Sequence, residues 1–298
     1  MTLASGAPRA RFYALAGLRF HALEWGGPLR PTRAPARSIV LLHGLASQAH
    51  IWDLVAPRLA EPARVIALDQ RGHGLTDKPE SGYDFATIAR DLELFLNAAQ
   101  IERPALVGHS WGGNVALEYA ARHPDRVAAL VFVDGGFLEI GARLDWPAAE
   151  KQLEPPDLAG MPLTALQAGL RNWLGPAWSE ATAAITLHNF EVLPDQTVRP
   201  RMRKVNHMKV VRALWEHRPS QLYAQVRCPV LLLPAIPPGP LEAAAQERLA
   251  GKRASVAQAE ERLAHSRTIW LADTLHDIPL HRPAELTRAI KDFIEVAE

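Results

Sequence analysis

The segment that most constrains the fold of this chain is Val107–Gly113, which reads Val-Gly-His-Ser-Trp-Gly-Gly. It is preceded by the apolar run 104–107, as expected for a strand that is buried on both faces. After Gly113 the apolar residues recur at helical spacing until a proline at position 124 ends the pattern. Ser110 is therefore predicted to lie on a tight turn between a strand and a helix.

A serine on such a turn must adopt a strained backbone conformation, and the glycines at 108 and 112 leave room for strand and helix to pack closely. The turn would lift the Ser110 hydroxyl above the sheet. It would also direct the backbone amide of Trp111, at the start of the helix, toward developing negative charge. An ordinary glycine-rich turn with an exposed serine is the alternative, but the strand-turn-helix context favours a nucleophile.

A second buried strand is predicted at 38–42, and it leads directly into His43-Gly44-Leu45. A glycine lets this loop fold over the serine, so that the Leu45 amide faces the same point in space as the Trp111 amide. We expect these two amides to form an oxyanion hole. His43 and Gly44 are candidate substrate-binding residues, although a hydrogen-bonded loop histidine is the simpler interpretation of the His43 side chain.

With both motifs in place, the chain resembles the α/β-hydrolase family, and the resemblance extends over nearly its whole length. The motifs stand in the order of that family: His43-Gly44, then Asp69-Gln70-Arg71-Gly72-His73-Gly74, then the Ser110 turn, and finally His276 after the apolar run 268–271. Each follows a predicted parallel strand, where open α/β sheets place their sites. The resemblance implies an α/β fold with a mostly parallel eight-stranded sheet, flanking helices and a helical cap inserted after strand 6.

The serine needs a general base, since an unassisted hydroxyl is barely ionised near neutral pH. His276 lies in a late loop before an amphipathic helix at 283–293, where the family places its base. Asp277 adjoins it, but its side chain should diverge from the ring, and we interpret it as a loop anchor. His109 adjoins the nucleophile and is a candidate at the substrate-binding surface, with a purely structural role as the simpler interpretation. His281 is interpreted as a surface loop residue.

The third member of the triad departs from the usual pattern of the family. Most relatives carry an aspartate after the seventh strand, here 229–233, but this strand is followed by Pro-Ala-Ile-Pro-Pro-Gly-Pro. The nearest acid, Glu242, is more consistent with the start of a helix. Some branches take the acid from the end of the sixth strand, here 129–133, which is followed by Asp134. Asp134 is therefore predicted to orient His276, with a structural tie to loop amides as the alternative.

Between the sixth and seventh predicted strands the strand-like runs disappear and helical spacing takes their place. We expect a core formed by 1–136 and 223–298, and a helical cap or lid at 137–222. Four of the eight tryptophans fall in the cap, which favours an apolar pocket and makes Trp173 a candidate substrate contact. Packing of the cap on itself is the alternative for any single tryptophan. The cations between 199 and 212 are interpreted as a solvated helix face rather than an anionic-substrate clamp.

Composition excludes several classes of function. A net charge of +1, from 33 basic and 32 acidic residues, gives no electrostatic footprint for nucleic acid or for an anionic membrane. No apolar stretch is long enough to span a bilayer, and the N-terminus lacks the apolar region of a secretory signal. The lone Cys228 rules out intramolecular disulfides. We expect a cytoplasmic enzyme without a nucleic-acid or membrane partner; the sequence does not fix its oligomeric state.

No metal-ligand spacing or dinucleotide-binding signature occurs, so no metal and no cofactor are expected. The expected function is that of a serine esterase, which cleaves carboxylic esters of small to medium apolar acids or alcohols through an acyl-enzyme. Since position 110 holds a serine and not an aspartate, the haloalkane dehalogenase and epoxide hydrolase branches of the family are disfavoured. The same triad acting on a lactone, an amide or a carbon-carbon bond is one alternative. A small-ligand sensor with slow or absent hydrolysis is another.

Overall fold

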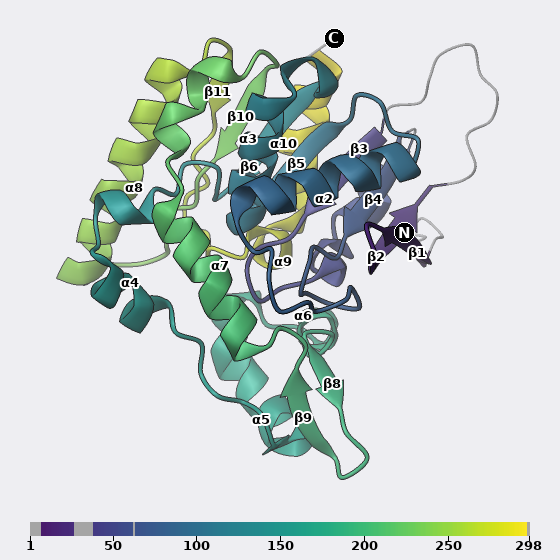
Figure 1. Cartoon of the computed structure of the whole chain (residues 1–298). Coiled ribbons are helices and arrows are strands. Elements are labelled where there is room, and N and C mark those ends of the chain that lie inside the picture. The colour runs from purple at the N-terminus through teal and green to yellow at the C-terminus, as the bar shows by residue number, and fades with distance from the viewer. Residues whose placement is uncertain (1–6, 27–37, 62, 297–298) are drawn as a thin grey trace.

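The computed structural model describes residues 7–26, 38–61 and 63–296. Its main element is an eight-stranded sheet with the order β1-β2-β4-β3-β5-β6-β10-β11 (Figure 1). The hairpin formed by β1 (Arg9–Leu15) and β2 (Leu18–Trp25) joins the sheet through an antiparallel pairing of β2 with β4. The other strands are parallel, which confirms the predicted sheet: β3 (Ser38–Leu42), β4 (Arg64–Leu68), β5 (Ala105–His109), β6 (Ala129–Val133), β10 (Val230–Leu233) and β11 (Ser266–Thr268).

Helices cover both faces of this sheet, and each face has its own hydrophobic cluster. Along β3, Val40 and Leu42 pack with one cluster while Ile39 and Leu41 pack with the other. This alternation explains why the central strands read as continuous apolar runs. The first cluster includes residues of α2 (Phe85–Ala98), α3 (Trp111–Arg122) and α8 (Ala243–Arg262); the second includes residues of α1 (Ala56–Leu59), α9 (Ile278–His281) and α10 (Pro283–Val296).

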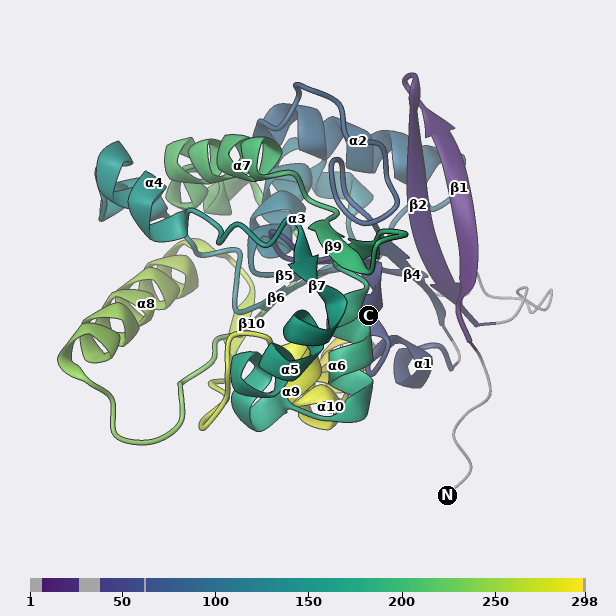
Figure 2. The same ribbon diagram turned by 90° about the horizontal axis from the view of Figure 1, so that it is seen from below.

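Between β6 and β10 the chain leaves the sheet and forms the segment that we call the cap, which lies in front of the sheet in Figure 2. Its helices are α4 (Trp146–Leu153), α5 (Leu163–Leu174), α6 (Glu180–Leu187) and α7 (Lys204–Glu216). The prediction that strands are absent here is wrong. A three-stranded antiparallel sheet forms from β7 (Met161–Pro162), β9 (Thr197–Pro200) and β8 (Phe190–Val192). These strands are too short for an alternating pattern to stand out in the sequence.

The last strand of the large sheet also differs from the prediction. The run expected at 268–271 is regular only up to Thr268, where β11 ends. Beyond that point Ile269 and Leu271 still donate backbone hydrogen bonds to the neighbouring strand segment, at 2.9 and 3.0 Å. The chain therefore keeps its place beside β10 and delivers the following loop to the carboxyl edge of the sheet.

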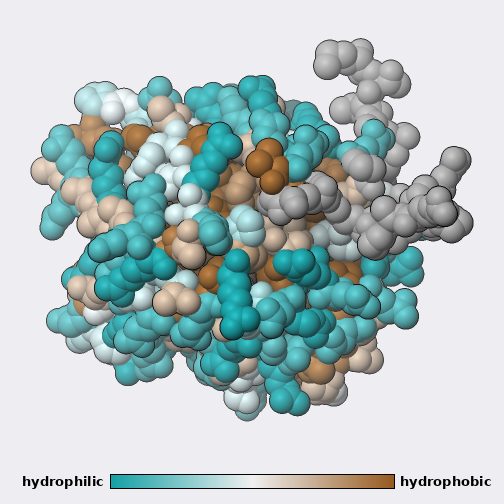
Figure 3. All heavy atoms as spheres, turned by 90° about the horizontal axis from the view of Figure 1, so that it is seen from above, coloured by the Kyte–Doolittle hydropathy of each residue, from teal (hydrophilic) through white to brown (hydrophobic). Residues whose placement is uncertain are grey.

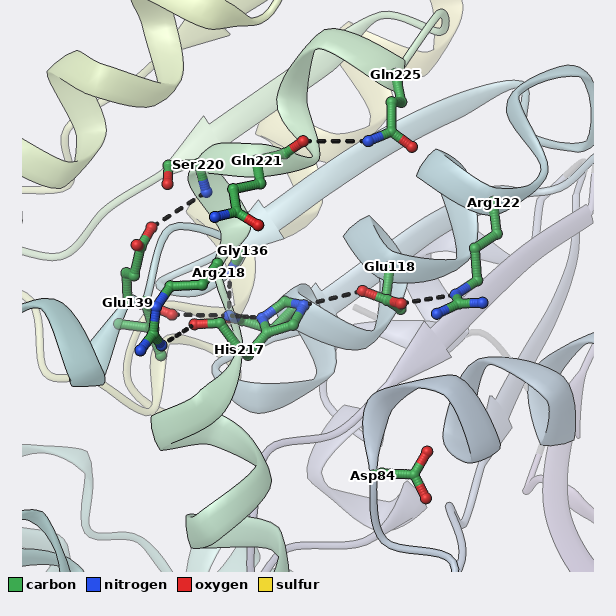
Figure 4. A network of polar contacts seen from close by, with 12 residues as sticks. Asp84, Glu118, Arg122, Gly136, Glu139, His217, Arg218, Ser220, Gln221 and Gln225 are labelled. Atoms are coloured by element: carbon green, nitrogen blue, oxygen red, sulfur yellow. Dashed lines mark hydrogen bonds and ion pairs between the residues drawn. The ribbon is translucent and has the colours of Figure 1, made fainter. Parts of the chain in front are cut away.

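A buried polar network fastens the cap to the core (Figure 4). His217, directly after α7, donates from Nε2 to Glu118 on α3 at 3.1 Å, and its Nδ1 accepts from Asn114 Nδ2 at 3.1 Å. The Asn114 Oδ1 in turn accepts from the Gly136 amide, at the entry of the cap, at 3.0 Å. Because one helix of the core binds both ends of the cap, the cap is held in a defined position over the sheet.

The surface seen from above in Figure 3 is largely hydrophilic, with hydrophobic side chains scattered between the polar ones. Among the helices of the described ranges, none is both long enough and apolar enough to cross a bilayer.

Candidate active site

Ser110 occupies the junction between β5 and α3, as the sequence predicts. Its backbone angles are φ 51° and ψ −122°, a left-handed conformation that is costly for a residue with a Cβ atom. Two backbone hydrogen bonds hold this conformation: the Ser110 amide donates to the Val133 carbonyl, and the Gly113 amide donates to the Ser110 carbonyl, each at 2.9 Å. The strained turn therefore belongs to the close packing of β5, β6 and α3.

Glycines surround the turn because no side chain would fit there. A Cβ atom on Gly108 would lie 2.3 Å from the Gly112 carbonyl oxygen, and one on Gly112 would lie 2.5 Å from the Leu42 carbonyl oxygen. Both clashes were expected from the sequence. Gly135, directly after Asp134, was not singled out, although its Cβ would lie only 2.1 Å from the Ser110 carbonyl oxygen. The ends of β3, β5 and β6 therefore pack around Ser110 through direct backbone contacts.

The structure brings the three predicted triad side chains together. His276 Nε2 lies 2.9 Å from Ser110 Oγ, and His276 Nδ1 lies 2.6 Å from Asp134 Oδ2. The Asp134 side chain is 2% exposed, whereas the His276 side chain is 53% exposed. With Nδ1–H donating to the carboxylate, Nε2 carries the lone pair that can accept the serine proton.

Asp134 has two further partners. Its Oδ1 accepts from the Ala235 amide at 2.9 Å, and the Lys252 ammonium lies 2.7 Å from Oδ1 and 2.9 Å from Oδ2. Burial favours the neutral acid, but the hydrogen bond and charge of His276 and the charge of Lys252 outweigh it and lower the pKa of Asp134 to about 2. The carboxylate is therefore ionised throughout the neutral range.

Lys252 was missed by sequence reasoning. It lies on α8, 118 residues from Asp134 along the chain, in a stretch that reads as an ordinary polar helix. No local pattern could have indicated that its side chain reaches the carboxyl edge of the sheet.

Several groups act on the His276 imidazole. Desolvation by the surrounding protein disfavours its charged form, but the hydrogen bond to Asp134, together with the charges of Asp134 and Asp277, outweighs this and raises the pKa of His276. The positive charge of Lys252 acts in the opposite direction and lowers it. A raised pKa means that His276 becomes protonated, and stops being a base, at a pH above the ordinary value for histidine.

The backbone amides expected to form an oxyanion hole lie beside the serine. The loop after β3 passes so close that a Cβ atom on Gly44 would lie 3.1 Å from the Ser110 Cβ. Trp111 is the first residue of α3, so its amide has no acceptor within the helix. In the part of the chain that the structure describes, no backbone hydrogen bond uses the Leu45 amide. Both donors are thus available to an oxyanion above Ser110.

Two buried histidines shape this loop. His43 donates from Nδ1 to the Gly44 carbonyl at 2.7 Å and accepts at Nε2 from the Gln70 amide at 3.1 Å. His73 accepts at Nε2 from the Ala46 amide at 3.3 Å. Burial lowers the pKa of both rings, so both are neutral. The prediction of a substrate contact by His43 is corrected here: its side chain is 0% exposed and holds the backbone of the loop.

His109 is likewise a structural residue rather than a substrate contact. Its ring is buried and donates from Nε2 to the His276 carbonyl at 3.0 Å, so it supports the loop that carries the base. His281, expected to be a surface residue, accepts from the Leu275 amide at 3.1 Å and supports the same loop. The Asp277 carboxylate is half-exposed and lies 3.7 Å from His109 Nε2. Glu242 is the N-cap residue of α8, as expected.

Two cavities lie between the cap and the loop after β3. The smaller, of about 160 Å³, borders Leu45 and Asp277, and so adjoins both the expected oxyanion hole and the base. The larger, of about 320 Å³, lies within the cap. Ala46, Trp173 and Asn189 line both cavities, so the two cavities are neighbours. Of the four predicted substrate-binding residues, only Trp173 lines them.

The other cap tryptophans pack on the cap itself. The rings of Trp146 and Trp215 meet edge to face, 5.9 Å apart, and the Arg212 guanidinium lies over both. Trp178 is covered by Arg171. The four tryptophans therefore do not form the pocket together, since only Trp173 lines the two cavities.

The cations of the cap divide into two groups. Arg212 is paired with Glu216 on the helix surface, as a solvated face predicts. Arg199, Arg203 and Lys204, however, line the larger cavity. Arg199 and Lys204 form ion pairs with Glu191 and Glu154, each at 2.6 Å. The Arg203 side chain forms no ion pair or hydrogen bond with any residue that the structure describes. The wall of the larger cavity is otherwise mostly apolar, with Leu158, Trp173, Phe190, Met202 and several prolines.

Within the described ranges, no group of three or more histidine, cysteine, aspartate or glutamate side chains is arranged to hold a metal ion.

Comparison with known proteins supports the reading of this site at the level of the fold. A 2-(acetamidomethylene)succinate hydrolase from Mesorhizobium japonicum is 36% identical over 96 residues, 32% of this chain and 34% of that protein. Epoxide hydrolase A from Mycobacterium tuberculosis is 34% identical over 157 residues, 52% of this chain and 44% of that protein. The chain thus spans less than half the length of these curated relatives.

Solved structures match over nearly the whole chain. The crystal structure of an E-2-(acetamidomethylene)succinate hydrolase superposes with a TM-score of 0.77 at 23% identity, covering 97% of this chain and 100% of that one. An enol-lactonase from Burkholderia xenovorans gives a TM-score of 0.72 at 19% identity, with 96% and 100% covered. The family described as alpha/beta hydrolase fold matches residues 37–277. That match includes the six parallel strands of the sheet, the serine turn and the loop of His276, and the chain belongs to the α/β-hydrolase fold family.

Proposed function

We propose that this protein is a serine hydrolase that cleaves carboxylic esters through an acyl-enzyme. The observation that carries the proposal is the hydrogen-bonded series from Ser110 Oγ to His276 Nε2 at 2.9 Å and from His276 Nδ1 to Asp134 Oδ2 at 2.6 Å. An alcohol, an imidazole and an ionised carboxylate in this order are the parts needed to activate a nucleophile for attack on a carbonyl.

The geometry supports the following sequence of steps for the proposed reaction. His276 takes the proton from Ser110 as the oxygen attacks the ester carbonyl, and the resulting oxyanion accepts hydrogen bonds from the Leu45 and Trp111 amides. The intermediate collapses, the alkoxide leaves with the proton from His276, and the acyl group stays on Ser110. Water, deprotonated by the same imidazole, then attacks the acyl-enzyme and releases the acid. Asp134 keeps the imidazole in the required tautomer and stabilises it while it is charged.

The cavities suggest which esters enter. The smaller cavity borders Leu45, and the neighbouring larger cavity, of about 320 Å³, is lined mostly by apolar groups, which fits small to medium apolar acids. The larger cavity is lined by three cations and by one carboxylate, that of Asp157, and one of the cations, Arg203, has no described ion-pair partner. An acyl chain with an apolar body and a carboxylate at its far end would satisfy both features. The segment 137–222 would in this proposal be the cap that selects the acyl group.

The same triad on a lactone or an amide is the second candidate. It is favoured by the similarity of this fold to a 2-(acetamidomethylene)succinate hydrolase and to an enol-lactonase. Esters, lactones and amides share the carbonyl attack and differ in the leaving group, so one panel of substrates separates them. A sensor with slow hydrolysis would bind the same compounds without releasing products.

The test uses p-nitrophenyl esters of increasing acyl length, a γ-lactone and a simple amide, with wild type and Ser110→Ala. We expect the wild type to release nitrophenol, and Ser110→Ala to lower kcat by about 10⁴-fold or more. A fluorophosphonate should label Ser110, as read by mass spectrometry, and leave Ser110→Ala unlabelled. Labelling without any turnover would support the sensor, and turnover that survives in Ser110→Ala would refute the proposed nucleophile.

A further inference from the structure

The triad carboxylate is held by a lysine from outside the sequence motifs. The Lys252 ammonium contacts both oxygens of Asp134, at 2.7 and 2.9 Å, and donates to the Ala235 carbonyl at 2.9 Å. These three contacts use all three donors of the ammonium group. The lysine side chain is 21% exposed and the carboxylate 2% exposed, so the pair lies largely out of solvent.

We propose that Lys252 is a positioning residue of the triad, which fixes the plane of the Asp134 carboxylate toward His276 and offsets part of its charge. The consequence is that His276 stays an unprotonated base at a lower pH than it would beside Asp134 alone. This inference rests on the proposed function, in which His276 acts as the base.

The geometric part follows from the partners of each oxygen. Asp134 Oδ2 accepts a hydrogen bond from His276, Oδ1 accepts one from the Ala235 amide, and the Lys252 ammonium donates to both oxygens. Without the lysine, only one backbone amide would oppose rotation of the carboxylate away from the imidazole. Asp134 also has a positive φ of 45°, so its backbone places the side chain in one direction that the lysine then secures.

The electrostatic part follows from the charges that face the imidazole. Asp134 approaches from the end of β6 and Asp277 from the same loop, and both raise the pKa of His276. His109, from β5, lies with its ring centre 5.0 Å away; burial and the charge of His276 lower its pKa to about 4, so it is neutral near pH 7. Lys252, from α8, is the cation that opposes the two carboxylates.

The position of Lys252 is built into the packing of α8. Its neighbour Gly251 leaves space for the Arg143 guanidinium, since a Cβ there would lie 2.2 Å from Arg143 Nη1. Arg143 also donates to Ser255 Oγ at 2.7 Å, which ties the helix to the start of the cap. On the face of α8 that carries Lys252, Val256 and Ala259 are buried in the core. Contacts with the cap and with the core therefore fix α8, and the Lys252 side chain reaches Asp134 from a fixed backbone position.

The experiment compares wild type, Lys252→Met and Lys252→Arg, with the exposed Lys151→Met as a control for loss of one positive charge. In the wild type, kcat/KM should fall as the pH drops through a His276 pKa above the ordinary value of about 6.5. Removing the lysine charge raises that pKa further, so the acidic limb of Lys252→Met should move to higher pH by about one unit, as expected for one charge a few Å away. Lys252→Arg keeps the charge and should leave the limb near its wild-type position.

A second measurement covers the case in which Lys252→Met does not fold. Titration of the His276 ring by NMR, in wild type and in Lys252→Arg and Lys252→Gln, reports its pKa without any substrate. The expected result is a higher pKa in Lys252→Gln than in the other two proteins. An unchanged His276 pKa in a folded Lys252→Gln would overturn the inference and leave the proposed function intact. A wild type that turns over no ester would refute the proposed function, while the titration would still decide the role of Lys252.

Discussion

The carboxyl edge of the sheet and the cap differ in how closely their residues are packed. At the edge, glycines let three backbones approach Ser110, and the triad side chains form one hydrogen-bonded series. In the cap, the strands are two to four residues long, Trp173 is 56% exposed, and cations meet carboxylates at the surface. The edge therefore tolerates almost no change in volume. We expect the exposed parts of the cap to tolerate more changes in shape and charge.

This difference teaches which properties each region controls. Bond making needs the nucleophile, the base and the oxyanion donors in one geometry, and close packing supplies it. Choice of substrate needs a surface that matches the acyl group, and the cavities between the two regions supply that. We expect substitutions at the edge to act on kcat and on stability, and substitutions in the cap to act on KM and on substrate preference.

The largest of these effects should come from Asp134, and Asp277, beside the same imidazole, provides the comparison. Asp134→Asn removes the charge that holds the imidazole tautomer, and kcat should fall by about 10³ to 10⁴-fold. Asp277→Asn removes a carboxylate that is one residue from the same histidine and half-exposed, and kcat should fall by less than about tenfold. Steady-state kinetics on one ester decide between them. Equal losses of kcat in the two variants would show that the hydrogen bond from His276 to Asp134 does not set this carboxylate apart from Asp277.

Two helical glycines, one at the edge and one in the cap, allow the same comparison to be made for the free energy of unfolding. Alanine is intrinsically better than glycine in a helix by about 1 kcal/mol. In α3, however, a Cβ on Gly113 would lie 2.6 Å from the Gly136 amide nitrogen, whereas in α5 a Cβ on Gly169 would meet nothing within 4 Å. Gly113→Ala should therefore destabilise the protein by about 2 kcal/mol or more, and Gly169→Ala should stabilise it slightly. Denaturant unfolding measures both, and a stabilised Gly113→Ala would contradict the packing described for the edge.

The smallest effect concerns the charge of the cap cavity. Two p-nitrophenyl esters with five-carbon acyl chains, a pentanoate and a monoglutarate, differ in a terminal carboxylate. Arg203→Gln should lower kcat/KM for the monoglutarate relative to the pentanoate by about fivefold, the equivalent of about 1 kcal/mol. Arg227→Gln, on the exposed surface of the core, is the control for net charge and should leave this ratio unchanged. If Arg203→Gln leaves the ratio of the two kcat/KM values unchanged, Arg203 does not recognise an anionic acyl group.

Much of the edge is visible in the sequence because its signals are local. The strand 129–133 occupies the predicted residues, and the turn at Ser110 is strained as its glycines indicate. The cap resisted prediction because its strands are too short to show a period, and because nothing in a sequence states which side of a helix a tryptophan or an arginine will turn to the cavity. Trp146 and Trp173 read alike in sequence, yet only Trp173 borders the cavities.

The sequence by itself determined the mostly parallel sheet, the order of the motifs along it and the residues that meet at its carboxyl edge. Alternation, apolar runs and glycine spacing are properties of neighbouring residues, and parallel strands bring their ends together without further information. Only the tertiary structure decided that Lys252 reaches Asp134, that His43 and His109 support backbone, and that Arg203 lines a cavity. Those facts depend on distances between segments remote in the chain, and such distances are set by packing, which no local pattern records.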